Sequence, residues 1–158
     1  MDATAIINLL TLLSLIGFGT IAKWYIWPKF KSGDVYGAVE PLLVFSFFRY
    51  LGLLFILPQA GIPAGFATTA AMGDLSVGIL AFIGAIFVHK RSGIGITLAW
   101  LYAILGSVDF LIAGGLANMN GVADHAEFIW LVFTVLGPAW MITLALLFVS
   151  LIKLPKKV

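Results

Sequence analysis

The chain has 158 residues, of which 62% are hydrophobic and 10% are charged, and its mean hydropathy is +1.12. Soluble domains carry about 25% charged residues, so this composition excludes a water-soluble globular protein. We predict an all-α integral membrane protein with a single domain over residues 1–158. The net charge of +2 does not indicate nucleic-acid binding, because the basic residues form short clusters between apolar stretches. The absence of cysteine excludes disulfides and thiolate chemistry.

Five long apolar segments follow one another along the chain. They predict a bundle of five transmembrane helices at about residues 5–27, 42–58, 68–88, 94–118 and 127–152. The second segment is short for a membrane span and could extend back into "VYGAVEPL", residues 35–42. The first segment has no basic leading region and no clear small-residue cleavage site, which argues against a signal peptide.

The basic residues predict the orientation of the helices. Eight of them fall at the end of segment one, between segments one and two, between segments three and four, or after segment five: Lys23, Lys29, Lys31, Lys90, Arg91, Lys153, Lys156 and Lys157. With five spans all of these places lie on one side of the membrane. Because cytoplasmic loops are enriched in lysine and arginine, we predict the N-terminus outside and the C-terminus inside. We expect a multi-pass protein of the cell membrane, in a prokaryote the inner membrane.

Three charged residues lie within apolar segments: Arg49, Asp74 and Asp109. All three are predicted roughly 9–13 Å below the outer ends of their spans, so they share one depth. An unpaired charge at such a position costs about 2.5–3.5 kcal/mol or more. We therefore predict that Arg49 pairs with Asp74, Asp109 or both inside the bundle. The formal charge of two carboxylates and one guanidinium is −1, so the cluster could hold a proton, a cation or a polar ligand.

Helical phase places the two carboxylates on small-residue faces, which favour close helix packing in lipid. On the third span the residues in phase with Asp74 are Gly78, Ala81 and Ala85. On the fourth span the residues in phase with Asp109 are Ala99, Ala103, Gly106 and Ala113. Tyr102 lies two turns from Asp109 and could extend the polar track inward. Pro138 in the fifth span removes a backbone donor, and a kink there could open room beside the cluster.

Two outer loops offer alternatives. The stretch "LPQAGIPAGFATTAAMGD", residues 57–74, is either a lid over the Arg49 site or a short turn followed by an early start of the third span. The stretch "NMNGVADHAEF" holds Asp124, His125 and Glu127, which could bind a divalent metal. Because such a set is more often a solvated helix start, we predict no metal site. No nucleotide, hydrolase or zinc-protease motif occurs, and we predict no cofactor from motifs.

The stretches "FRYLGLLFILPQAGIP" and "AAMGDLSVGILAFIGAIFVHKRSGIGITLAWLYAILGSVDFL" resemble the small DoxX-like membrane proteins over about residues 47–112. Those proteins have an arginine-led apolar helix, then a Gly-acid-x-x-Gly helix and a basic turn. This chain departs from them in its extra leading span and in having Asp74 where glutamate is usual. The resemblance implies a four-helix core with Arg49 and Asp74 in its polar interior, and a quinone-linked or redox-complex accessory role.

Three hypotheses for function follow. In the first, Arg49, Asp74, Asp109 and Tyr102 bind or conduct a proton, an ion or a small polar ligand. In the second, the protein is an accessory subunit of a larger membrane complex, for example a respiratory one. In the third, which we rank last, it is an enzyme that acts on a lipid or quinone with Asp74 or Asp109 as acid or base. Beside all three stands the alternative that the cluster only fixes helix register. Self-association through small-residue faces is also expected.

Overall fold

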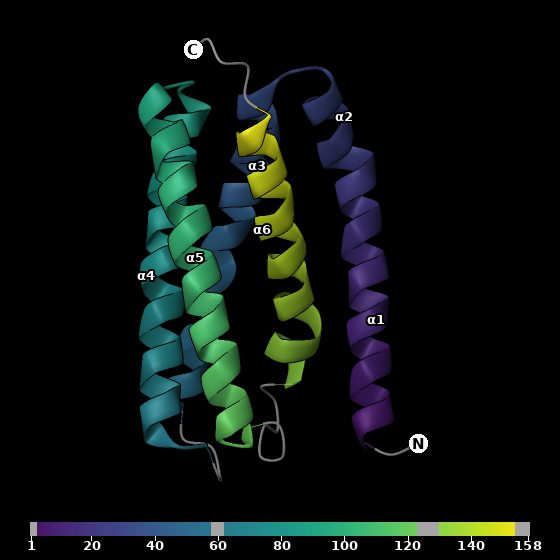
Figure 1. Cartoon of the computed structure of the whole chain (residues 1–158), viewed down its shortest axis with the longest axis vertical. Coiled ribbons are helices and arrows are strands. Elements are labelled where there is room, and N and C mark those ends of the chain that lie inside the picture. The colour runs from purple at the N-terminus through teal and green to yellow at the C-terminus, as the bar shows by residue number, and fades with distance from the viewer. Residues whose placement is uncertain (1–2, 58–61, 123–129, 154–158) are drawn as a thin grey trace.

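The structure is a computed structural model that describes residues 3–57, 62–122 and 130–153. Over these residues the chain is helical and contains no strand. Five helices are long and apolar enough to cross a membrane. They run side by side along the long axis of the molecule, and the two termini lie at opposite ends of the bundle (Figure 1). We call these ends the N-terminal and the C-terminal end.

Three of the five long helices contain irregular segments. The first consists of α1 (Ala3–Ile21), a π-helical segment η1 (Ala22–Ile26) and α2 (Trp27–Lys31). The second consists of α3 (Val35–Phe47) and a 3₁₀ segment η2 (Phe48–Ile56). The third and fourth are the regular helices α4 (Ala64–His89) and α5 (Gly93–Met119). The fifth consists of a π-helical segment η4 (Val132–Leu136) and α6 (Gly137–Ile152).

The predicted spans agree with these helices in number and differ at their ends. The second helix begins at Val35, where the Asp34 side chain accepts a hydrogen bond of 3.1 Å from the Gly37 amide and caps α3. The helix thus includes the "VYGAVEPL" stretch. The third helix begins at Ala64 rather than near residue 68, which favours the short turn over the lid. The predicted start of the fifth span, at residue 127, lies outside the described residues.

Helices α3 to α6 form a four-helix bundle, and α1 lies at its side. Helices α4 and α5 pack closely, and Ala81, Ala99 and Ala103 of their small-residue faces are buried as predicted. Gly78 is also buried, but it faces α3 and η2, where a Cβ atom would lie 3.2 Å from the Phe47 carbonyl oxygen and 3.3 Å from the Tyr50 amide nitrogen. At Gly95 a Cβ atom would lie only 2.5 Å from the Val88 backbone nitrogen, so glycine is required for this contact. Helix α1 contacts α6 and η4, and none of its most apolar window is buried within the protein (Figure 1).

The bundle contains two hydrophobic cores. The first, which we call the aliphatic core, lies between regular helices and consists mainly of valine, leucine and alanine, with Leu43, Val88 and Leu147 fully buried. The second, which we call the aromatic core, lies towards the N-terminal end and contains Phe55, Phe66 and Trp140. Arg49 belongs to neither core and is almost completely buried at 1% exposure.

Candidate functional site

The 3₁₀ segment η2 positions the central residue of the site. A 3₁₀ helix has three residues per turn, so side chains three positions apart lie above one another. The buried residues of η2 are Arg49, Gly52 and Phe55, which follow this spacing and face the bundle interior. A 3₁₀ run of nine residues is unusually long, and such stretches often mark functional or strained positions. Sequence analysis treated this stretch as α-helix and missed the shared face.

Arg49 joins three helices through its guanidinium group. Its Nε donates a hydrogen bond of 2.7 Å to Asp74 Oδ1 on α4, and its Nη2 donates one of 2.5 Å to Asp109 Oδ2 on α5. Its Nη1 donates one of 3.0 Å to the Gly106 carbonyl. The predicted pairing of Arg49 with both carboxylates is therefore confirmed. Because charged hydrogen bonds satisfy the buried guanidinium on two sides, the cluster is tolerated in an apolar interior.

Two glycines make room for the carboxylates. A Cβ atom on Gly52 would collide with the Asp74 carboxyl group, and one on Gly73 would collide with Asp109 Oδ1. Gly52 lies on η2 and Gly73 on α4, so each glycine admits an acid from the neighbouring helix. Neither position was predicted as part of the site. The "MGD" sequence could have indicated one of them, but the acid that contacts Gly73 is Asp109 and not the adjacent Asp74.

Two buried polar groups near Arg49 lack hydrogen-bond partners among the described residues: the Tyr102 hydroxyl and the Trp140 indole N–H. The Trp140 ring lies 5.7 Å from the Arg49 guanidinium carbon, within the range of a cation–π interaction. Both side chains are at least 97% buried, and a buried donor without a partner is rare and costly. Sequence analysis selected Tyr102 and missed Trp140, because tryptophan in an apolar helix is ordinarily a packing residue.

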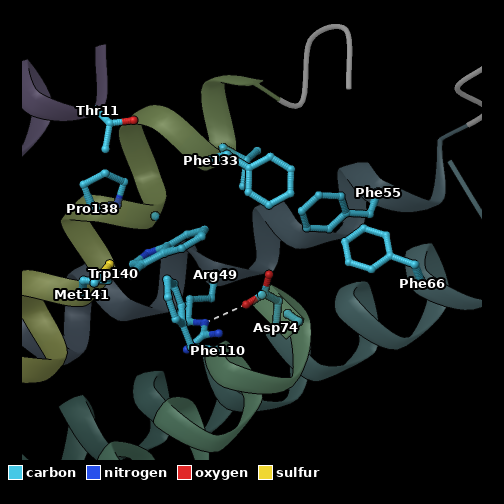
Figure 2. A pocket seen from close by; sticks show the side chains of 14 residues that line it. Thr11, Arg49, Phe55, Phe66, Asp74, Phe110, Phe133, Pro138, Trp140 and Met141 are labelled. Carbon is cyan, nitrogen blue, oxygen red and sulfur yellow. Dashed lines mark hydrogen bonds and ion pairs between the residues drawn. The ribbon is translucent and has the colours of Figure 1, made fainter. Parts of the chain in front are cut away.

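A cavity of about 170 Å³ lies next to the cluster, between α1, η2, α4, α5, η4 and α6. Five aromatic rings form most of its wall: Phe55, Phe66, Phe110, Phe133 and Trp140. Arg49 and Asp74 are the charged residues in the wall, and their ion pair faces the ring of Trp140 (Figure 2). Asp109 and Tyr102 do not line it. Of the four predicted site residues, two therefore line the cavity and the other two do not.

The π-helical segment η4 widens the fifth helix beside this cavity. The Gly137 amide donates to the Val132 carbonyl five residues earlier, and Pro138 follows at the start of α6. Val132, Gly137 and Pro138 all line the cavity. The irregularity expected at Pro138 is thus present one turn before the proline, and π-turns of this kind are frequent at functional sites.

The metal ligands considered in the third outer loop, Asp124, His125 and Glu127, lie outside the described residues. Within the described ranges no group of three or more metal-ligating side chains comes together.

Comparison with known proteins assigns a family. The family model "Domain of unknown function (DUF8737)" matches residues 6–152. The chain belongs to this family. The match covers all five long helices almost completely, and so the cluster, the cavity and α1 lie within one family domain. No curated protein and no solved structure matches the chain. The resemblance to DoxX-like proteins stays a prediction.

Proposed function

We propose that this DUF8737 protein spans a cell membrane five times, with its N-terminus outside and its C-terminus inside. Six basic residues of the described chain support the orientation, and they occur near helix ends at the C-terminal end of the bundle: Lys23, Lys29, Lys31, Lys90, Arg91 and Lys153. The exception is Arg49, which is buried and paired. This asymmetry is typical of the cytoplasmic side. In a prokaryote the membrane is the inner membrane.

Within that membrane we propose that the protein binds a small lipid-soluble ligand that carries a hydrogen-bond acceptor. The observation that supports this function is the cavity wall, in which an unpartnered Trp140 N–H lies beside the Arg49–Asp74 pair and among aromatic rings. Binding sites commonly combine an apolar lining with a few polar groups that fix the ligand's orientation. An acceptor that reached the Trp140 N–H would remove the cost of an unsatisfied donor.

The position of the cavity supports entry from the lipid. Its wall includes Gly114 on α5 and Met141 on α6, both of which are exposed on the surface of the protein. A Cβ atom on Gly114 would meet nothing within 4 Å. These residues belong to the apolar part of the helices, so the opening faces hydrocarbon in a membrane. A ligand that dissolves in the bilayer can reach such an opening without crossing water.

The chemistry of the wall favours one ligand class over the others considered. Both carboxylates are already bound to Arg49, which reduces their capacity to coordinate a cation. Rings around the cavity favour an apolar or aromatic body, and the free indole N–H favours a carbonyl or hydroxyl oxygen. Quinones and lipid alcohols combine these two features. The simplest function of such a site is to bind the ligand without a chemical reaction. The roles of accessory subunit and enzyme, and self-association, stay predictions.

Native mass spectrometry on protein gently extracted from its own membrane tests the proposal. We expect a bound small molecule of defined mass in the unmodified protein. Gly114→Leu places a side chain in the cavity, whereas Gly115→Leu is a matched control because Gly115 has equally open surroundings and does not line it. Gly114→Leu is expected to abolish the bound mass and Gly115→Leu to retain it. Absence of a bound molecule from the unmodified protein, or equal retention in both variants, overturns the proposal.

A second pair of variants tests the hydrogen-bond donor. Trp140→Phe removes the N–H and keeps an aromatic ring, and Trp100→Phe is the control because Trp100 packs against Phe148 away from the cavity. Loss of a hydrogen bond of about 0.5–1.5 kcal/mol should lower occupancy by roughly 2–10-fold in Trp140→Phe only. Equal occupancy in the two variants would mean that the indole N–H does not contact the ligand.

A further inference from the structure

A second feature of the molecule, separate from the Arg49 cavity, is a groove between the first helix and α6. One part of the groove, of about 400 Å³, is lined by apolar residues of α1, η1, α3 and α6. The other, of about 540 Å³, includes Lys23, Lys31, Trp24 and Trp27. Both parts share Ala22, Ile142 and Leu146, so they form one continuous groove with a basic end and an apolar end.

The π-helical segment η1 aligns the two lysines at the basic end. A π-helical turn contains about one residue more than an α-helical turn. The helix therefore completes about two full turns between Lys23 and Lys31. Gly19, Lys23, Trp27 and Lys31 consequently lie in one row along the groove. An uninterrupted α-helix would place Lys31 roughly 80° away from Lys23. The irregular segment thus gathers two positive charges on the face that lines the groove.

The described residues do not neutralise the charge of the groove. No acidic residue lines either part, and neither Lys23 nor Lys31 forms an ion pair among the described residues. Trp24 and Trp27 lie beside the lysines, as aromatic residues do at the level of lipid headgroups. A basic end flanked by tryptophan is complementary to an anionic headgroup.

The apolar end has the dimensions of a lipid chain. Along α1 and η1 it extends from Phe18 to Ile26, which is roughly 12 Å at 1.5 Å per residue. One leaflet of a bilayer contributes about 15 Å of hydrocarbon. At the end remote from the lysines the rings of Phe18 and Phe45 lie 6.1 Å apart and connect α1 with α3. The groove therefore follows the direction and most of the length of an acyl chain.

We propose that this groove binds one anionic phospholipid of the inner leaflet, with its phosphate between Lys23 and Lys31 and an acyl chain along Ala22, Ile142 and Leu146. The proposal depends on the membrane orientation given above, because the cytoplasmic leaflet carries the anionic lipids. It does not depend on a ligand in the Arg49 cavity. The bound lipid fills the space between α1 and the four-helix bundle, and so attaches the least buried helix to the rest of the protein.

Native mass spectrometry on the full chain, reconstituted with equal amounts of phosphatidylglycerol and phosphatidylcholine, tests the site. We expect one phosphatidylglycerol to be retained with about 25-fold preference, since each of the two lysines contributes about fivefold near a membrane surface. Lys23→Gln with Lys31→Gln should remove this preference. Lys29→Gln with Lys90→Gln removes the same charge from residues that do not line the groove, and should keep it. Equal loss in both double variants, or no preference in the unmodified protein, overturns the proposal.

A further pair of variants tests the apolar end. Ile142→Trp fills the junction of the two parts, whereas Ile152→Trp enlarges an exposed residue on the same helix that does not line the groove. We expect Ile142→Trp to lower the retained phosphatidylglycerol at least fivefold while both lysines are intact. Equal retention in these two variants would show that the lysines attract lipid headgroups without a bound chain. Neither pair touches the Arg49 cavity, so failure here is distinguishable from failure of the cavity proposal.

Discussion

The aliphatic core and the aromatic core are built from the same four helices in different ways. In the aliphatic core α3, α4, α5 and α6 are α-helical, with Pro41 inside α3, and small and branched side chains pack between them. In the aromatic core η2 and η4 replace regular turns, and large rings surround a cavity of about 170 Å³. The cluster of Arg49, Asp74 and Asp109 lies at the boundary between the two.

This difference indicates that the two cores have different roles within one bundle. Close packing of alanine and glycine on α4 and α5 fixes the positions of the helices. At the other end irregular segments and rings leave a cavity and, among the described residues, an unpartnered Trp140 N–H, and a bound molecule is expected there. The comparison predicts that changes in the aliphatic core lower stability and leave the cavity unaltered in the folded protein. Changes at cavity-lining residues outside the charged cluster, such as Gly114, should lower the occupancy of the ligand and leave stability nearly unchanged.

The largest effect is expected from Arg49→Leu, which removes the residue that joins the two regions. It leaves Asp74 and Asp109 as buried carboxylates without a counter-ion, and breaking a buried pair in this way costs about 3–5 kcal/mol. Thermal unfolding in detergent should show this loss. Arg91→Leu breaks a pair of 3.3 Å at an exposed surface and should change stability by less than about 1 kcal/mol.

A companion variant shows whether the loss comes from charge or from packing. Asp74→Asn and Asp109→Asn, added to Arg49→Leu, remove both uncompensated charges and should recover part of the lost stability. No recovery would mean that Arg49 stabilises the bundle mainly through its contacts, such as the one with the Trp140 ring.

Gly95→Ala tests the aliphatic core alone. The added Cβ atom would lie 2.5 Å from the Val88 backbone nitrogen and 2.7 Å from the Phe87 carbonyl carbon, so α4 and α5 would have to separate. Overpacking of this kind costs about 1–3 kcal/mol. Gly93→Ala, at a glycine with nothing within 4 Å, is the control and should be nearly neutral. Any ligand of the Arg49 cavity should still be present in the folded fraction of Gly95→Ala; its selective loss would argue against two independent regions.

The cluster itself could be predicted from the sequence, because charges in apolar helices must find partners inside the bundle. Arg49, Asp74 and Asp109 are the charges far from the ends of the predicted spans, and their shared depth leaves few pairings. The small-residue faces at Ala81 and Ala103 followed from helical periodicity. What periodicity could not supply is the 3₁₀ geometry of η2, since an α-helical count separates Arg49 from Phe55 by roughly 240°.

The cavity could not be predicted for a different reason. Its wall combines residues from α1, η2, α4, α5, η4 and α6, and whether rings such as Phe110 and Phe133 fill the space or surround it depends on their three-dimensional arrangement. Trp140 has no polar neighbour in sequence that would mark its indole N–H as unpartnered. Tyr102 was selected for its phase with Asp109, but the structure places it in the aliphatic core and outside the cavity.

The two acids of the cluster should differ in their effects. One carboxylate suffices to balance Arg49, and Asp74 is the more buried partner, with a side chain 7% exposed against 16% for Asp109. Asp74→Asn exchanges a charged hydrogen bond for a neutral one and should cost about 1–2 kcal/mol. Asp109→Asn keeps the Asp74 pair and should cost less than about 0.5 kcal/mol. Thermal unfolding of both variants decides this; the opposite order would identify Asp109 as the principal counter-ion.

The smallest effect is expected from Tyr102→Phe, which tests whether a residue behind the cluster contributes to function. The hydroxyl lies beside Ser46 and Arg49 without a hydrogen bond of standard geometry to a described residue, and the ring packs in the aliphatic core with no exposed surface. Ser46 donates to the Leu42 carbonyl and Arg49 to the two acids, so removal of the hydroxyl leaves neither without a partner. The free energy of unfolding should therefore change by no more than about 0.5 kcal/mol in either direction. The occupancy of the cavity should also stay unchanged, because Tyr102 does not line it. A loss of bound ligand in Tyr102→Phe with normal stability would show that the ligand site extends past Arg49 to the Tyr102 hydroxyl. The boundary between the two regions would then lie at Tyr102 and not at the charged cluster.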